Sequence, residues 1–309
     1  MAEFQQSSTI IDAPARVAPR PPHELVGRHV ARGDGRRLFL LENRVEAARG
    51  NIIMVPPFGR TVHDLFLLAN FLTFNGFSVF RFDPADHDGL SDGVMEDFTL
   101  PGLERDTWLA TEAFRLSPGV PTLALGMSLS FPVALKFAGA CPTIAGVISV
   151  VGVVDTEDTL DKAVGVHPRE YRKTPITAPT IVEPFGCRIR AHNFVTAMDE
   201  ACYSTRADIE RYLEALVKPL YMLAAEEDEY VDIDVVERVF GAHHHGGQLE
   251  RIPGVSHEIG RSVGAAKLVA ARVVEFALRS VGASGIREPT LVEAIAESQR
   301  ETEYLNTFE

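Results

Sequence analysis

The chain has 309 residues, of which 46% are hydrophobic, and its 30 Lys and Arg against 43 Asp and Glu give a formal net charge of −13. This length suits one large α/β domain with an insertion, or two small domains, and the hydrophobic fraction is ample for a buried core. The acidic balance argues against nucleic acid as a partner, and no apolar run reaches the ~20 residues that span a bilayer.

The N-terminal stretch is polar and rich in Ser, Ala, Pro and Arg, which predicts a mobile arm over residues 1–22. It lacks the charged-then-apolar order of a signal peptide. The three cysteines, Cys141, Cys187 and Cys202, show no metal-binding spacing, and reduced thiols are their simplest interpretation. We therefore expect a cytoplasmic protein.

Strand and helix patterns alternate over the next hundred residues. A turn signal at Gly33-Asp34-Gly35 predicts a hairpin within residues 26–42. Buried strands are expected at 51–55 and 77–83, and amphipathic helices at 62–74 and 103–116. Short strands that alternate with helices predict a mostly parallel central sheet flanked by helices, wound by right-handed crossovers.

The stretch around Ser128 has the layout of a nucleophile elbow. An apolar strand ends at Gly126, Ser128 follows, and a segment that can be helical begins at Ser130. Such a turn strains the backbone of the serine, so its neighbours two residues away on each side must be small. The usual second glycine is replaced here by Ser130. The alternative is an ordinary strand–helix turn that happens to contain serines.

Regularity breaks after another buried strand at 144–151. Residues 154–217 carry several prolines, mixed charges and no strong strand, and they are too many for a plain loop. We expect a helical cap or lid insertion there, between core segments 23–153 and 218–309. Its apolar residues, among them Ile176, Phe185 and Phe194, suggest that the cap forms a substrate pocket. The alternative is a helical patch that only covers the edge of the sheet.

The pattern returns in the last third of the chain. Strands are expected at 220–225 and 248–252, a helix from Val235, and a long closing helix at 261–281. The tail from Glu288 is acidic.

Two loops in this last third supply the groups that a serine nucleophile needs. The acidic run Glu226-Glu227-Asp228-Glu229 follows one predicted strand, and His257 follows the last one. The order serine, acid, histidine is that of α/β-hydrolases, and loops at strand C-termini are where such sheets build their sites. The neighbouring glutamates remain rivals to Asp228. His87 is a rival base, which chain order ranks below His257.

Two further features concern the oxyanion and metals. An oxyanion hole needs two backbone N–H groups, expected from Leu129 and from the loop after the strand at 51–55. Pro56 and Pro57 cannot donate, so Phe58 is the expected second donor. The run His243-His244-His245 has no metal-ligand spacing. We expect no metal and no cofactor.

The chain resembles the acyl-acyl-carrier-protein thioesterases (acyltransferases) of bacterial luminescence operons, which have the α/β-hydrolase fold. The stretches that carry the resemblance run from the strand at 51–55 to the tail. They are Gly59-Arg60-Thr61-Val62-His63-Asp64, Asn75-Gly76-Phe77, Arg81-Phe82-Asp83, His87-Asp88-Gly89-Leu90-Ser91, Asp97-Phe98-Thr99, Ser128-Leu129-Ser130, Val151-Gly152-Val153-Val154, Phe194, Asp199, Asp228, Ser256-His257 and Glu288-Pro289. That family also has serine two residues after its nucleophile. Met127 is a departure from the family pattern.

The resemblance implies Ser128 as nucleophile, Asp228 as acid and His257 as base. It also implies a fatty acyl thioester substrate, carried by acyl carrier protein or coenzyme A, and a reductase complex as partner that converts the product to aldehyde. Met127, Phe185 and Phe194 are candidate substrate contacts. Two other functions stay open: a carboxylesterase or lactone hydrolase with the same triad, and a non-catalytic ligand-binding protein of this fold.

Overall fold

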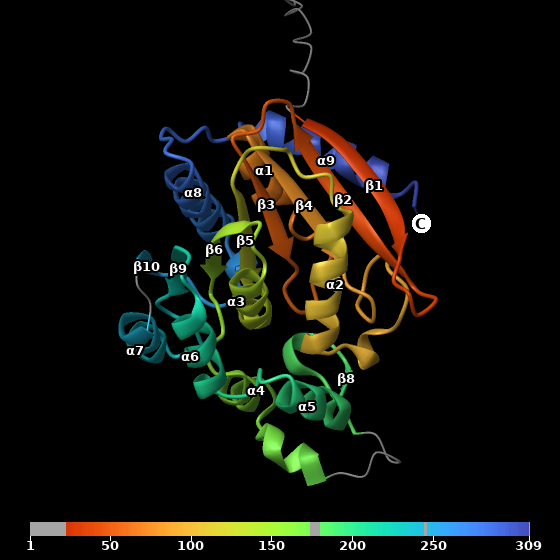
Figure 1. Cartoon of the computed structure of the whole chain (residues 1–309), viewed down its shortest axis with the longest axis vertical. Coiled ribbons are helices and arrows are strands. Elements are labelled where there is room, and N and C mark those ends of the chain that lie inside the picture. Colours follow the sequence, from red (N-terminus) through yellow and green to blue (C-terminus); the bar gives the residue numbers. More distant parts are fainter. Residues whose placement is uncertain (1–22, 174–179, 244–245, 309) are drawn as a thin grey trace, which may run out of the picture.

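A central sheet of eight strands organises the part of the chain that the computed structural model describes, residues 23–173, 180–243 and 246–308 (Figure 1). The predicted arm at 1–22 and Ile176 lie outside the described residues. The strand order is β1-β2-β4-β3-β5-β6-β9-β10. The strands are β1 (His23–Ala31), β2 (Arg37–Val45), β3 (Gly50–Val55), β4 (Phe77–Asp83), β5 (Thr122–Met127), β6 (Ile144–Val150), β9 (Leu220–Ala225) and β10 (Gly247–Ile252). β2 is antiparallel to β1 and β4, and the pairs from β4 to β10 are parallel, as predicted.

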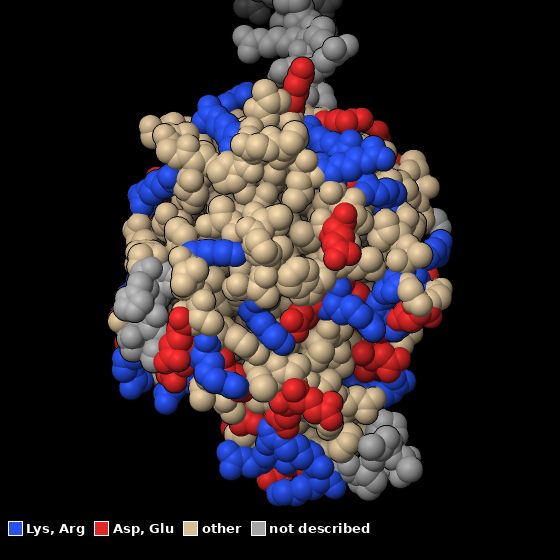
Figure 2. All heavy atoms as spheres, in the orientation of Figure 1, with Lys and Arg blue, Asp and Glu red and all other residues tan. Residues whose placement is uncertain are grey.

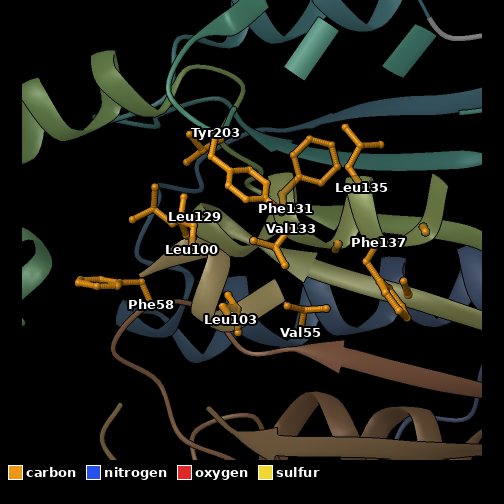
Figure 3. Packing of buried hydrophobic residues seen from close by; sticks show 14 of the residues in the cluster. Val55, Phe58, Leu100, Leu103, Leu129, Phe131, Val133, Leu135, Phe137 and Tyr203 are labelled. Carbon is orange, nitrogen blue, oxygen red and sulfur yellow. The ribbon is translucent and has the colours of Figure 1, made fainter. Parts of the chain in front are cut away.

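Alternating side chains of the central strands fill two cores, one on each face of the sheet. In β3, Ile53 and Val55 belong to the core beneath α2 (Leu100–Ala113) and α3 (Phe131–Ala140). Figure 3 shows α3 side chains packing together with Val55 and with Leu103 of α2. Ile52 and Met54 belong to the other core, beneath α1 (Phe66–Phe74) and α8 (Val263–Ser280). Because successive strand residues point to opposite faces, a strand buried on both sides reads as one continuous apolar run.

Helices α1 and α2 begin furthest from the residues that their periodicity predicts. The helix expected at 62–74 begins at Phe66, because the Asp64 carboxylate accepts the N–H of Thr61 (2.8 Å) and holds the preceding residues in a turn. The helix expected at 103–116 begins at Leu100, where the Thr99 hydroxyl accepts the N–H of Gly102 (3.1 Å) as N-cap. An N-cap of this kind satisfies a donor at the first turn, so side-chain oxygens set both boundaries.

The segment predicted as a cap contains helices and two short strands. They are α4 (Thr156–Val164), η3 (Pro168–Lys173), β7 (Ile181–Val182), η4 (Pro184–Gly186), β8 (Ile189–Arg190), α5 (Ala191–Glu200) and α6 (Arg206–Ala215). Its buried side chains join the same core as β3 and α3, and α6 packs against α3 and α7 (Ile233–His243). The segment is therefore continuous with the core on one face of the sheet, and its role as a lid stays a prediction.

The C-terminal helix α9 (Leu291–Leu305) lies across the N-terminal strands. The buried Arg81 guanidinium of β4 pairs with the Glu301 carboxylate (2.7 Å) and donates to the Asn43 side chain (2.7 Å). This pairing joins the last helix to β2 and β4. Within the described residues, no helix is both long and apolar enough to cross a membrane.

Candidate active site

Ser128 stands at the turn between β5 and the helical segment η2 (Ser128–Ser130), with a positive φ of 50°. This is the strained conformation expected of an elbow. Gly126 is required there, since a Cβ on it would lie 2.7 Å from the Ala134 Cβ. The buried Ser130 hydroxyl accepts the Met127 N–H (2.9 Å) and donates to the Val55 carbonyl (3.0 Å). Ser130 thus fastens the turn to β3, and the Ser128 hydroxyl takes no part in these bonds.

The Ser128 hydroxyl contacts a histidine, and that histidine contacts a carboxylate. Both groups come from loops that are distant from Ser128 in the sequence. Ser128 Oγ lies 2.7 Å from Nε2 of His257, and Nδ1 of His257 lies 2.8 Å from Oδ2 of Asp228. Asp228 Oδ1 also accepts the N–H groups of Tyr230 (2.9 Å) and Val231 (2.8 Å). An acceptor-only carboxylate at Nδ1 favours the tautomer with its proton there, which leaves Nε2 free to accept the serine proton.

The rivals to Asp228 and His257 lie elsewhere. Glu226 and Glu227 are exposed. Glu229 accepts the backbone N–H of His257 (3.2 Å), which is not a contact with the imidazole ring. His87 is buried behind the loop that follows β3, where its Nε2 accepts the Gly59 N–H (2.9 Å). Burial lowers the pKa of His87, which favours a neutral ring. Neither ring nitrogen of His87 is directed at Ser128, because Nδ1 contacts the Asp88 carbonyl (3.1 Å).

The loop after β3 lies beside Ser128 and offers one suitable backbone donor. The Gly59 N–H is already engaged by His87, and prolines have none. The Phe58 N–H has no acceptor among the described residues. Phe58 also lines the same cavity as Ser128. Its role as an oxyanion donor, like that of Leu129, stays a prediction.

A cavity of about 620 Å³ opens beside Ser128 and His257. This volume lies within the range of small-molecule sites, ~300–1,000 Å³. Its apolar wall includes residues of α1 and α8, and the charged side chains of Arg60, Asp64, Glu258 and Arg261 stand around it. The apolar residues are Pro57, Phe58, Leu65, Leu67, Leu68, Met127, Val151, Phe185, Ile259, Ala266, Val269 and Ala270. The sequence pattern assigned the α1 and α8 residues to helix faces and held no signal that some of them line a cavity.

The two phenylalanines predicted as substrate contacts lie in different surroundings. Phe185 lines the cavity at a positive φ of 53°, and its ring stacks on the His257 ring with centroids 6.0 Å apart. Tyr230, which sequence reasoning missed, packs edge-on against both rings. Phe194 does not line this cavity. It is buried against Phe58 and Phe98 and lines a smaller cavity within the cap, and its role as a substrate contact stays a prediction.

No group of three His, Cys, Asp or Glu side chains able to hold a metal occurs among the described residues. His244 and His245 lie outside them. The residues around Ser128 bring together groups suited to nucleophilic acyl transfer: a hydroxyl, an imidazole held by a carboxylate, and a backbone donor nearby.

Comparisons with known proteins agree with this chemistry. The model of the family described as acyl transferase matches residues 34–278. The acyl transferase of Vibrio harveyi is 28% identical over 249 residues, which are 76% of this chain and 78% of the relative. That of Aliivibrio fischeri (strain MJ11) is 26% identical over 227 residues, 72% of each chain.

Solved structures show the fold. Est1E from Butyrivibrio proteoclasticus, solved with ferulic acid bound, matches with a TM-score of 0.65 at 20% identity, covering 82% of this chain and 99% of Est1E. A monoacylglycerol lipase from Paleococcus ferrophilus matches with a TM-score of 0.59 at 17% identity, covering 84% and 100%. The expected α/β-hydrolase fold is confirmed.

Proposed function

The chain belongs to the acyl transferase family, and we propose that it cleaves fatty or related acyl thioesters through a Ser128–His257–Asp228 triad and an acyl-enzyme. The observation that carries the proposal is the pair of hydrogen bonds that join Ser128 Oγ to His257 Nε2 and His257 Nδ1 to Asp228. A hydroxyl, a base and an acid that orients the base are the parts that activate a serine.

The reaction follows from these contacts. His257 Nε2 takes the Ser128 proton as Oγ attacks the thioester carbonyl, and the N–H groups of Phe58 and Leu129 stabilise the oxyanion. When the carbon–sulfur bond breaks, the imidazolium returns its proton to the departing thiolate. Water, or another hydroxyl or thiol acceptor, then loses a proton to His257 and attacks the Ser128 ester. The bond between the acyl carbon and Ser128 Oγ breaks, the imidazolium returns the proton to Oγ, and the acyl product leaves. No cofactor enters either half-reaction.

The acyl chain is proposed to lie in the cavity between α1 and α8. This differs from the sequence-based hypothesis, which gave the pocket to residues 154–217. Of the cap residues, Phe185 lines the cavity, whereas Leu160 and Phe194 are buried in the core that the cap shares with α3. Each methylene buried from water contributes about 0.8 kcal/mol, so the depth of this apolar wall would set the preferred chain length.

The carrier of the thioester is a second part of the proposal. Figure 2 shows basic and acidic side chains interspersed, with a basic group at the lower end, where Figure 1 places the segment after α4. Arg172 there pairs with Glu157 and Asp199, and Lys173 pairs with Glu170. These pairs offset the positive charge that an acidic carrier protein would need to contact at this end of the molecule. The family resemblance remains the support for acyl carrier protein and for a reductase complex as partner, and the cysteine pattern remains the support for a cytoplasmic setting.

Intact mass spectrometry tests the function. The protein is incubated with acyl thioesters of several lengths on acyl carrier protein and on coenzyme A, and with the matching oxygen esters. We expect one acyl adduct on Ser128, stronger with thioesters. Faster turnover of oxygen esters would favour a carboxylesterase or lactone hydrolase. Failure of a fluorophosphonate to label Ser128 would favour a non-catalytic binding protein.

A further inference from the structure

The loop that carries Phe58 is held from behind by His87, which the triad does not use. The Gly59 N–H donates to His87 Nε2 (2.9 Å), and the opposite ring nitrogen lies 3.1 Å from the Asp88 carbonyl oxygen. His87 is only 3% exposed. Building on the proposed function, we propose that His87 is a positioning residue, which fixes this loop so that the Phe58 N–H faces the oxyanion of the reaction.

The hydrogen bond has a direct geometric consequence for Phe58. The Gly59 N–H belongs to the peptide plane that follows Phe58, so fixing its direction fixes the backbone on that side of Phe58. Gly59 itself has a φ of 71°, a conformation open to glycine. Without the bond from Gly59 to His87, the N–H groups of the loop after β3 would not be held in one orientation. Preorganised donors are worth most when nothing has to reorient during the reaction.

His87 is supported in turn by packing and by a buried carboxylate. Its ring lies 5.3 Å from the ring of Phe98, which is itself 5.3 Å from that of Phe58. At the end of β4, the Asp83 carboxylate accepts the N–H of Val62 (2.7 Å) and that of Leu90 (2.9 Å). The Val62 contact therefore ties the loop after β3 to the end of β4, and the Leu90 contact closes the loop that carries His87.

The choice of histidine follows from its two nitrogens. In the neutral ring one nitrogen donates and the other accepts, so a single side chain can bond the Asp88 carbonyl and the Gly59 N–H together. Leucine at position 87 would fill similar space without an acceptor. Glutamine offers an amide oxygen near the position of Nε2, so His87→Gln is the conservative variant that can restore the bond.

The test compares His87→Leu, His87→Gln and His29→Leu with the wild-type protein. His29 also contacts the loop after β4, through the Leu90 carbonyl (2.7 Å), but lies on β1. We expect His87→Leu to lower kcat roughly 10- to 100-fold with little change in KM, less than the ~10²–10³-fold loss of a whole oxyanion donor. Affinity for an acyl trifluoromethyl ketone, which forms a tetrahedral adduct, should fall by the same factor. His87→Gln should recover part of kcat, and His29→Leu should match the wild type.

A second readout does not depend on activity. Hydrogen–deuterium exchange of a peptide spanning residues 57–60 should be faster in His87→Leu than in the wild type. Unchanged exchange, unchanged kcat, or an equal loss in His29→Leu would overturn the positioning role. Absence of an acyl-enzyme in the wild type would instead overturn the proposed function, so the two failures are distinguishable.

Discussion

Ser128 and Ser130 are two residues apart, yet their hydroxyl groups make different contacts. The Ser128 hydroxyl contacts His257, while the buried Ser130 hydroxyl joins β5 to β3. This division explains why a serine can replace the second glycine of the elbow. The small side chain still lets helix and strand approach, and its hydroxyl satisfies backbone groups that a glycine would leave to other partners.

The two serines should therefore respond in opposite ways to replacement by alanine. Ser128→Ala should abolish acyl-enzyme formation and change the free energy of unfolding by about 1 kcal/mol or less. Ser130→Ala should retain fluorophosphonate labelling of Ser128 but lose about 1–3 kcal/mol, because buried backbone groups lose their partner. Labelling and urea denaturation measure both. Normal turnover in Ser128→Ala would sink the mechanism.

At the scale of elements, helices α1 and α8 form one unit, because both cover the same face of the sheet and both line the cavity. Cavity walls on packed helices keep a defined shape, because each wall residue is supported by core neighbours. Specificity for chain length is thus expected to follow substitutions on these helices rather than on α4 or α6.

A bulky residue on α8 should shorten the preferred acyl chain. Ala266 lines the cavity and is half-buried, so Ala266→Phe adds volume there without entering the core. Turnover should shift toward shorter thioesters. Ala265→Phe, at a half-buried neighbour that does not line the cavity, is the matched control. If the two variants show the same dependence of turnover on acyl chain length, the proposal that the acyl chain binds in this cavity is wrong.

The cap segment gives a second prediction at this scale. Phe185→Ala should change turnover with little loss of stability, because the ring is only partly buried and faces His257. Phe194→Ala should lose about 3–5 kcal/mol, since its ring is fully buried, and should keep the wild-type order of chain-length preference. Steady-state kinetics and thermal denaturation separate the effects. A new chain-length preference in Phe194→Ala would support the sequence-based hypothesis that the cap forms the acyl pocket.

At the scale of the whole molecule, a polar cluster joins the first strand, β1, to the last helix, α9. Beside the Arg81–Glu301 pair, the buried His23 of β1 accepts from Arg300 of α9 (2.8 Å) through Nε2. Burial, then the nearby guanidinium groups of Arg300 and Arg81, lower the pKa of His23 to about 3. The Glu297 carboxylate of α9 lies 3.3 Å from the same nitrogen, Nε2 of His23. The hydrogen bond from Arg300 requires a neutral imidazole, because a protonated Nε2 has no lone pair to accept it.

Acid should weaken this junction. Between the pKa of the unfolded chain, 6.5, and the folded value, about 3, the unfolded state binds more protons, so stability falls as the pH falls. From pH 7.5 to pH 5 the His23 contribution should drop by about 2 kcal/mol. Burial raises the pKa of Asp83 to about 6, which acts in the opposite sense.

Comparison of His23→Gln with the wild type isolates the effect, since Asp83 is common to both. Urea denaturation at the two pH values should show that the wild type loses about 2 kcal/mol more than the variant on acidification. An identical pH dependence of the two proteins would contradict the assignment to His23.

Local pattern was sufficient for much of the fold and for the serine and histidine of the candidate triad. Strand and helix periods predicted the parallel sheet, because residue spacing reports which side of an element is buried. The elbow is likewise local: Gly126, Ser128 and Ser130 lie within five residues, and the turn demands small side chains at set positions. Chain order and loop position named Ser128 and His257 and left the acid open among residues 226–229. The family resemblance selected Asp228, and the structure brings the three residues into contact. Their catalytic roles remain predictions.

Tertiary structure alone decided the contacts between residues distant in the sequence. The cavity wall joins α1 to α8, and the Arg81–Glu301 pair spans 220 positions. The acceptor at His87 and the donor at Gly59 meet only because β3 and β4 are neighbours in the sheet. Periodicity says that a helix face is apolar, but it does not say whether another helix or an open cavity lies against that face. That outcome depends on how the elements pack, which no single stretch of sequence contains.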